Sequence, residues 1–300
     1  MECYSLELVH DVGGALQGPR DYRAPMLLSV PRAYILTMHE TETFPWLHGV
    51  ARRTYVQRNR GFRACPKTRS NGRRVDATNQ DIVHAYRAVF ERERDTTDPV
   101  LVFEDDARLA STAKEDLEIV DLFVSTQRFS VYSLGSFGLM VPHDRQSGHW
   151  RLAGGVFGFA QAVIYSPLCV RAILGATDVG PREHIDGQII GPMSGKFTYH
   201  RPIAYQVIDI KNKSENSATW CVRCDGSASD SVLNNLVFAF FGALGLDRER
   251  GWRKMYGFCK LVVPLGILVS ALVVGLLGLL VTRLVARHTR RRRALITAAK

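Results

Sequence analysis

The sequence predicts an α/β domain followed by a C-terminal transmembrane helix. Its first half alternates strand, helix and strand: a buried strand at 32–38, a helix from about Gln80 to Arg94, and a second buried strand from Val100. Strands joined through a helix pair in parallel by a right-handed crossover. The transmembrane prediction rests on residues 261–282, an uncharged apolar run of 22 residues, where about 20 suffice to cross a bilayer.

Composition is that of a folded protein, with 46% hydrophobic and 23% charged residues in 300. The net charge of +10 is concentrated in one place, because seven basic residues and no acid lie in the tail at 283–300, which leaves 10 − 7 = +3 for the remainder. Basic residues beside a membrane span are explained by topology and anionic lipid. Nucleic-acid binding is therefore the least favoured function for this chain, and no nucleic-acid partner is predicted.

The chain divides into five segments by composition. They are an irregular leader at 1–30, a main domain at 31–210, a linker and juxtamembrane region at 211–260, the span at 261–282 and the basic tail at 283–300. The leader carries acids and has no long apolar core, so it does not resemble a signal peptide. The expected protein is single-pass with a C-terminal anchor. The main domain most simply stays cytosolic, although basic residues on both sides of the span leave the orientation open.

Further elements follow from periodicity and breakers. The expected helices are near 46–57, at 111–125 and at 167–176, and the expected strands are at 128–137, 154–166 and 197–206. Six cysteines are scattered, and the single close pair, Cys221 and Cys224, lacks the second pair that a zinc site needs. We interpret the cysteines as structural or incidental.

Three adjacent carboxylates end the strand in DPVLVFEDDARL: Glu104, Asp105 and Asp106. Ligands of parallel sheets bind outside the carboxyl ends of strands, and hard cations prefer carboxylate oxygens. Along an extended chain Glu104 and Asp106 project to one side and Asp105 to the other. The stretch therefore indicates a divalent cation, Mn²⁺ or Mg²⁺, beside a nucleotide diphosphate; the alternative is a solvated, acid-rich turn.

Five stretches occur in an order that resembles glycosyltransferase family 25, which includes lipooligosaccharide and procollagen galactosyltransferases. They are AYILTM, IVHAYRAVF with His84, VLVFEDDA, GFAQAVIYSPLCVRAIL and HIDGQII, within roughly residues 32–208. His84 follows Val83, where the family has Ser. The resemblance implies a GT-A-like, Rossmann-like domain that binds a nucleotide sugar.

The resemblance also implies roles for the acids. Asp106 would be the metal ligand with Glu104, Glu104 or Asp105 would lie near the nucleotide, and Asp186 matches the later Asp of the family. From chemistry, transfer to a hydroxyl needs a group that takes its proton, and Asp186 is the candidate base; the alternative is a loop Asp that caps a helix. His200, on the last expected strand, is a candidate third metal ligand, since imidazole binds manganese-type ions.

Residues 52–74 carry nine basic residues and no acid, and Arg52, Arg53 or Arg58 could approach a diphosphate. The predicted function is a membrane-anchored, metal-dependent glycosyltransferase that moves a hexose, galactose or glucose, from a UDP-sugar to a hydroxyl of a glycan or protein. The alternative is a catalytically inactive membrane-anchored scaffold that keeps this fold. Metal-dependent nucleotide binding discriminates between the two.

Overall fold

The computed structural model describes residues 3–12, 25–69, 71–144, 146–158, 160–176, 185–207, 239–266 and 272. The strands are β1 (Tyr4–Asp11), β2 (Arg32–Thr37), β3 (Arg53–Asn59), β4 (Val100–Glu104), β5 (Ala107–Leu109), β6 (Val131–Ser133), β7 (Phe137–Asp144), β8 (His149–Gly158), β9 (Ala162–Tyr165), β10 (Lys196–Tyr199) and β11 (Ala204–Gln206). The helices are α1 (Gly61–Ala64), α2 (Thr78–Arg92), α3 (Ala113–Thr126) and α4 (Pro167–Gly175), with helical turns η1 (Pro45–Leu47) and η2 (Ile185–Ile190). Residues 239–244 and 249–266 are also helical.

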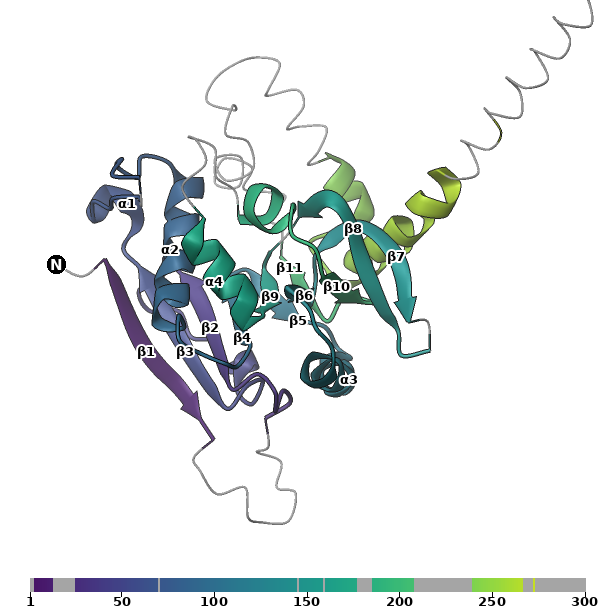
Figure 1. Ribbon diagram of the computed structural model, residues 1–300, viewed down its shortest axis with the longest axis horizontal. Coiled ribbons are helices and arrows are strands. Elements are labelled where there is room, and N and C mark those ends of the chain that lie inside the picture. The colour runs from purple at the N-terminus through teal and green to yellow at the C-terminus, as the bar shows by residue number, and fades with distance from the viewer. Residues whose placement is uncertain are drawn as a thin grey trace, which may run out of the picture.

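One nine-stranded sheet, in the order β1-β3-β2-β4-β9-β6-β10-β8-β7, runs through the molecule (Figure 1). Strand β2 lies between β3 and β4 and is parallel to both, whereas β9 is antiparallel to its neighbours β4 and β6. From β2 the chain goes to β3 on one side and then to β4 on the other. Strands β5 and β11 form a separate antiparallel pair. The α/β prediction is confirmed: most strands of the large sheet point the same way, consistent with a Rossmann-like arrangement.

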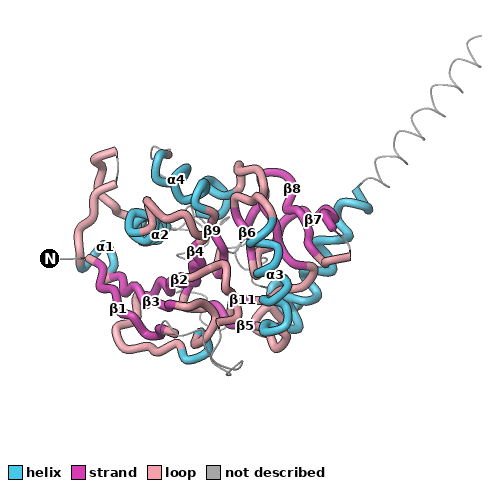
Figure 2. The backbone as a smooth tube through the Cα atoms, turned by 60° about the horizontal axis from the view of Figure 1, so that its bottom comes forward, coloured by secondary structure: helices cyan, strands magenta, loops and turns pink. Residues whose placement is uncertain are grey.

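Strand β4 shows why the sheet forms here. Its residues alternate between two hydrophobic clusters, with Val100 and Val102 in one and Leu101 and Phe103 in the other. The first cluster includes α2, α4 and the helix at 249–266, and the second includes α3 and the segment at 44–51. Figure 2 shows α2 and α4 on one side of the sheet and α3 on the other. A strand buried on both faces reads as a continuous apolar run, as this one does.

Two sequence predictions for the first 60 residues are wrong. Residues 4–11, assigned to an irregular leader, form β1, which pairs with β3 at the edge of the sheet. The helix expected near 46–57 is the turn η1 followed by β3. Pairing with β1 on one side and β2 on the other overrides the local pattern of this basic stretch.

The segment before the apolar run is part of the fold and not a linker throughout. The helix at 249–266 buries Trp252, Met255, Tyr256 and Cys259 in the first hydrophobic cluster. Within the described residues, no helix is both long enough and apolar enough to cross a bilayer. Of the predicted span at 261–282, only 261–266 and 272 are described, so the span and the basic tail lie mostly outside them.

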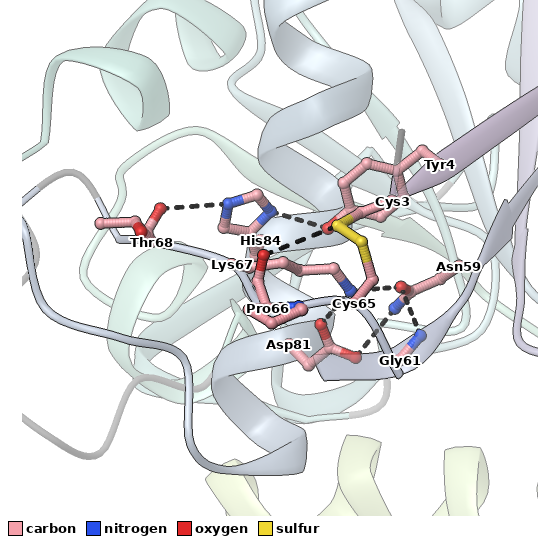
Figure 3. Close-up of a disulfide and its surroundings, with 10 residues drawn as sticks. All are labelled: Cys3, Tyr4, Asn59, Gly61, Cys65, Pro66, Lys67, Thr68, Asp81 and His84. Atoms are coloured by element: carbon pink, nitrogen blue, oxygen red, sulfur yellow. Dashed lines mark hydrogen bonds and ion pairs between the residues drawn. A yellow bond between two sulfur atoms is a disulfide. The ribbon is translucent and has the colours of Figure 1, made fainter. Parts of the chain in front are cut away.

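A disulfide between Cys3 and Cys65 ties β1 to the segment after α1 (Figure 3). Beside it the buried ammonium of Lys67 pairs with the Asp81 carboxylate at the start of α2, and the Asn59 amide donates to the same carboxylate at 3.0 Å. Asp81 therefore has partners for both oxygens inside the fold. This cluster fixes the edge strand and the start of α2 relative to each other.

We expect loss of the disulfide to destabilise the fold, because the bond closes a loop with a sequence separation of 62 residues. Chain-entropy arguments give about 4 kcal/mol for a loop of this size. Cys65→Ser should lower the free energy of unfolding of the detergent-solubilised full chain by about that amount in urea titration. Reductant should affect the parent protein and not the variant; an unchanged parent in reductant would contradict the disulfide.

Candidate functional site

The acid triplet lies where β4 leaves the sheet and turns toward β5. Glu104 is the last residue of β4, and Asp105 and Asp106 form the turn. Each carboxylate contacts a different element: Glu104 contacts α2, Asp105 contacts the end of β2, and Asp106 contacts β11. The carboxylates thus occupy a junction of several elements at one edge of the sheet and not a solvated turn alone.

Glu104 points to the α2 face of the sheet. The Tyr86 hydroxyl lies 3.1 Å from its Oε1 and also 3.1 Å from the carbonyl oxygen of Ala160. Burial raises the pKa of Glu104 well above its usual range, and the charges of Asp106 and Asp186 raise it further. Two further carboxyl groups are therefore close enough to disfavour ionisation of Glu104, an effect that a bound cation would reverse.

Asp106 is held by β11. Its Oδ2 accepts a hydrogen bond from the Gln206 amide, and its backbone carbonyl accepts one from the Val207 N–H at 2.9 Å. Its Oδ1 is buried and has no hydrogen-bond partner among the described residues. Burial raises the pKa of Asp106 to about 7, against the opposing effect of the Gln206 hydrogen bond. A buried carboxylate oxygen without a partner is unfavourable unless a ligand or ion satisfies it.

Asp105 contacts Thr37, the last residue of β2, and His39, which follows that strand. Its Oδ2 accepts a hydrogen bond from the Thr37 hydroxyl at 2.7 Å and lies 3.9 Å from Nε2 of His39, which in turn lies 3.8 Å from Oε2 of Glu42. One ligand atom from each of His39, Glu42 and Asp105 lies within 4.8 Å of the others. This is the one group of three or more such side chains, in the parts of the chain described, with a spacing that a metal ion could bridge.

Two arginines lie at this His39–Glu42–Asp105 trio. Arg58 donates to the carbonyl oxygens of His39 at 2.7 Å and Glu42 at 3.2 Å. Arg108 lies 3.9 Å from the Glu42 carboxylate. Of the three arginines that could approach a diphosphate by sequence, Arg58 is the one at this trio, and it also pairs with Glu7 of β1 at 3.1 Å. Arg53 instead pairs with Asp11 on β1 at 3.3 Å, and Arg52 is exposed.

Of the two other predicted site residues, one lies near the acids and one does not. Asp186 lies on η2, and its charge contributes to the raised pKa of Glu104, so the structure brings these two carboxylates near each other. His200 does not join them. It follows β10, with β9 and β6 between that strand and β4, and its ring is tilted by 58° against the Tyr199 ring with centroids 4.3 Å apart. The set Asp106, Glu104 and His200 does not form a metal-sized group among the described residues.

His84, the imidazole of the helix motif, also lies away from the acids. Its Nδ1 is 2.7 Å from the Tyr4 hydroxyl and its Nε2 is 3.3 Å from the Thr68 carbonyl, beside the disulfide (Figure 3). Burial lowers its pKa, and the charge of Lys67 adds to this effect. These contacts connect β1 to α2 and indicate a structural role.

Sequence reasoning missed His39, Glu42, Tyr86 and Gln206. A usable signal existed for the first two, because HETET directly follows the strand parallel to β4, and parallel neighbours end at the same edge. No local signal marks Tyr86, which has the spacing of an ordinary core residue, or Gln206, which lies about 100 residues from its partner.

Comparison with known proteins gives no match: no protein-family model and no curated sequence matches this chain. The function must therefore be argued from the site.

The raised pKa values predict a pH-dependent stability. A carboxyl whose pKa is raised by folding favours the folded state at low pH, and this contribution is lost as pH rises from about 4, the ordinary value, to about 7, the folded value of Asp106. In EDTA, Asp106→Asn should therefore raise Tm more at pH 8 than at pH 5.

The matched control is Glu118→Gln, at an exposed carboxylate on α3. Its effect on Tm should be small at both pH values. An Asp106→Asn effect that is equal at pH 5 and pH 8 would contradict the raised pKa.

Proposed function

We propose that this protein is a membrane-anchored, metal-dependent glycosyltransferase with a GT-A-like domain, which transfers a hexose from a UDP-sugar to a hydroxyl of a glycan or protein. The observation that carries the proposal is the convergence of Glu104, Asp105 and Asp106 at the carboxyl end of β4, beside Thr37 and His39 at the end of β2. Arg58 and Arg108 lie at the neighbouring His39–Glu42–Asp105 trio, and the Asp186 carboxylate lies near Glu104.

The position of the acids supports nucleotide binding. Nucleotides bind to open α/β sheets at the point where the strand order reverses, outside the carboxyl ends of the strands. Here the reversal lies between β2 and β4, since the chain passes from β2 to β3 on one side and to β4 on the other. The acids follow β4 at this point. Arg58 and Arg108 provide positive charge for a diphosphate beside them.

The residues also fit a divalent cation. The unpartnered Oδ1 of Asp106 and the mutual repulsion of Asp106 and Glu104 both favour an added positive charge. Oxygen ligands of this kind suit Mg²⁺ and Mn²⁺. When bound, the ion would supply charge neutralisation for the diphosphate leaving group. The trio of His39, Glu42 and Asp105 is a second place that fits such an ion, because its ligand atoms lie within 4.8 Å of one another.

Asp186 is the proposed base. Its carboxylate lies near that of Glu104, on a turn that precedes Gly191 and the strand β10. A carboxylate here can accept the proton of an acceptor hydroxyl as the new glycosidic bond forms. Galactose and glucose remain the proposed donor sugars.

The apolar run at 261–282 supports a membrane anchor, since its length and lack of charge suit a bilayer. The disulfide between Cys3 and Cys65 supports a domain on the oxidising side of that membrane, because disulfides persist in secretory and extracytoplasmic compartments and are rare in the cytosol. This favours a lumenal or external domain over the cytosolic placement that the sequence analysis expected.

Calorimetric titration of UDP into the detergent-solubilised full chain tests the proposal. We expect binding in Mn²⁺, little binding in EDTA, and loss of the Mn²⁺-dependent part in Asp106→Asn. Absence of UDP binding in every condition would contradict the transferase and favour the inactive scaffold. UDP binding that is unchanged by EDTA and by Asp106→Asn would contradict the metal site.

A second titration, of Mn²⁺ alone, distinguishes the two ligand sets. If Asp106 and Glu104 hold the ion, Asp106→Asn should weaken Mn²⁺ binding by about tenfold or more, a range typical of ligand-environment changes, and His39→Ala should have a smaller effect. The reverse order would assign the ion to the His39–Glu42–Asp105 trio. His200→Ala is the matched histidine control, and weakening by this variant would restore His200 as a ligand.

A further inference from the structure

The acid Asp106 is fixed by the small sheet β5–β11 and not by the large one. In that pair Gln206 lies opposite Ala107, the residue after Asp106. The Gln206 amide bonds the Asp106 carboxylate, and the Val207 N–H bonds the Asp106 carbonyl. The position of β11 therefore determines where this carboxylate lies.

The C-terminal helix at 249–266 holds this small sheet at two points. The indole Nε1 of Trp252 donates to the backbone carbonyl of Gln206 at 2.9 Å and to that of Leu246 at 3.0 Å. One turn earlier, the Glu249 carboxylate accepts hydrogen bonds from the N–H of Ser111 at 2.9 Å and from its hydroxyl at 3.0 Å. Ser111 lies shortly after β5. The helix thus contacts β11 itself and Ser111, two residues beyond the end of β5.

The helix is itself held rigidly. Trp252 has no exposed surface and Tyr256 is 1% exposed, in the cluster that also includes Tyr86 of α2. The Tyr256 hydroxyl lies 3.1 Å from the Thr198 hydroxyl on β10. With its ring enclosed, Trp252 has little freedom to move its N–H away from Gln206. Figure 1 shows this helix at the side of the sheet near β7 and β8.

We propose that Trp252 is a positioning residue for Asp106, acting through Gln206, so that the helix leading into the apolar run is a working part of the acid site. The inference rests on the proposed function in that it takes Asp106 as a binding residue. It assigns the juxtamembrane helix a role in ligand binding, in addition to connecting the domain to its anchor.

The competing explanation is that Trp252 only fills the core. Trp252→Phe removes the N–H and keeps an aromatic ring, while Phe258→Leu, at an exposed residue of the same helix, is the matched control. Loss of the hydrogen bond to the Gln206 carbonyl should weaken Mn²⁺ binding about three- to tenfold in Trp252→Phe, whereas Phe258→Leu should leave it unchanged. The measurement is Mn²⁺ affinity of the full chain by electron paramagnetic resonance.

A double-mutant cycle separates positioning from packing. If Trp252 acts through Gln206, then Trp252→Phe should lower Mn²⁺ affinity in the parent and have no further effect on it in a Gln206→Leu background. Its effect on Tm should persist in both backgrounds. An affinity loss that is equal in both backgrounds, and that follows the loss of Tm, would overturn the inference in favour of core filling.

Hydrogen exchange keeps the two proposals distinguishable, because it needs no ligand. Trp252→Phe should speed exchange of the amides at 106–109 and 204–207 and spare those of β2 and β3, whereas Phe258→Leu should change neither. Unchanged exchange at 106–109 would overturn the positioning role whatever the protein binds. If the parent chain binds neither Mn²⁺ nor UDP but Trp252→Phe still speeds exchange at 106–109, the positioning role of Trp252 stands and the transferase is rejected.

Discussion

The burial of β4 on both faces is the constraint on which the site depends. Its residues 100–103 all lie in hydrophobic clusters, so an unpaired charge within that run would carry the full cost of desolvation. The first carboxylate, Glu104, appears where the strand reaches the edge of the sheet. Its partner and those of Asp105 and Asp106 come from separate parts of the chain, α2, β2 and β11. The three acids are adjacent in the sequence, and the fold adds their separate partners and brings Asp186 near Glu104.

Repulsion between these carboxylates affects which of them are protonated. Without a cation, burial and neighbouring charge favour the protonated forms of Glu104 and Asp106, and Asp106 titrates at about 7. A cation that binds at the proposed site would have to displace protons, so its affinity would rise with pH. The neighbouring trio differs, because His39 is exposed and Asp105 already accepts a hydrogen bond from Thr37. The two proposed sets of ligands should therefore respond differently to substitution.

Local periodicity predicted the central elements well, and tertiary contacts account for what it missed. The helix expected from Gln80 to Arg94 is α2, shifted by two residues, and the apolar run before Glu104 is β4. Strand β3 was predicted as a helix because its pairing with β1 and β2 is not visible in its own pattern. By sequence, His200 was placed on the last expected strand as a candidate metal ligand, but a strand pattern does not give lateral order. Two strands, β9 and β6, separate β10 from β4.

Because the buried helix at 249–266 lies late in the chain, the first hydrophobic cluster can be completed only late in synthesis. Chains emerge from the ribosome N-terminus first, and domains fold as their parts become available. The first hydrophobic cluster lacks Trp252, Met255 and Tyr256 until this last described helix has emerged. The apolar run at 261–282 follows within a few residues. Closure of the core and emergence of the apolar run therefore fall close together in time, and Trp252 can bond the Gln206 carbonyl only at that stage.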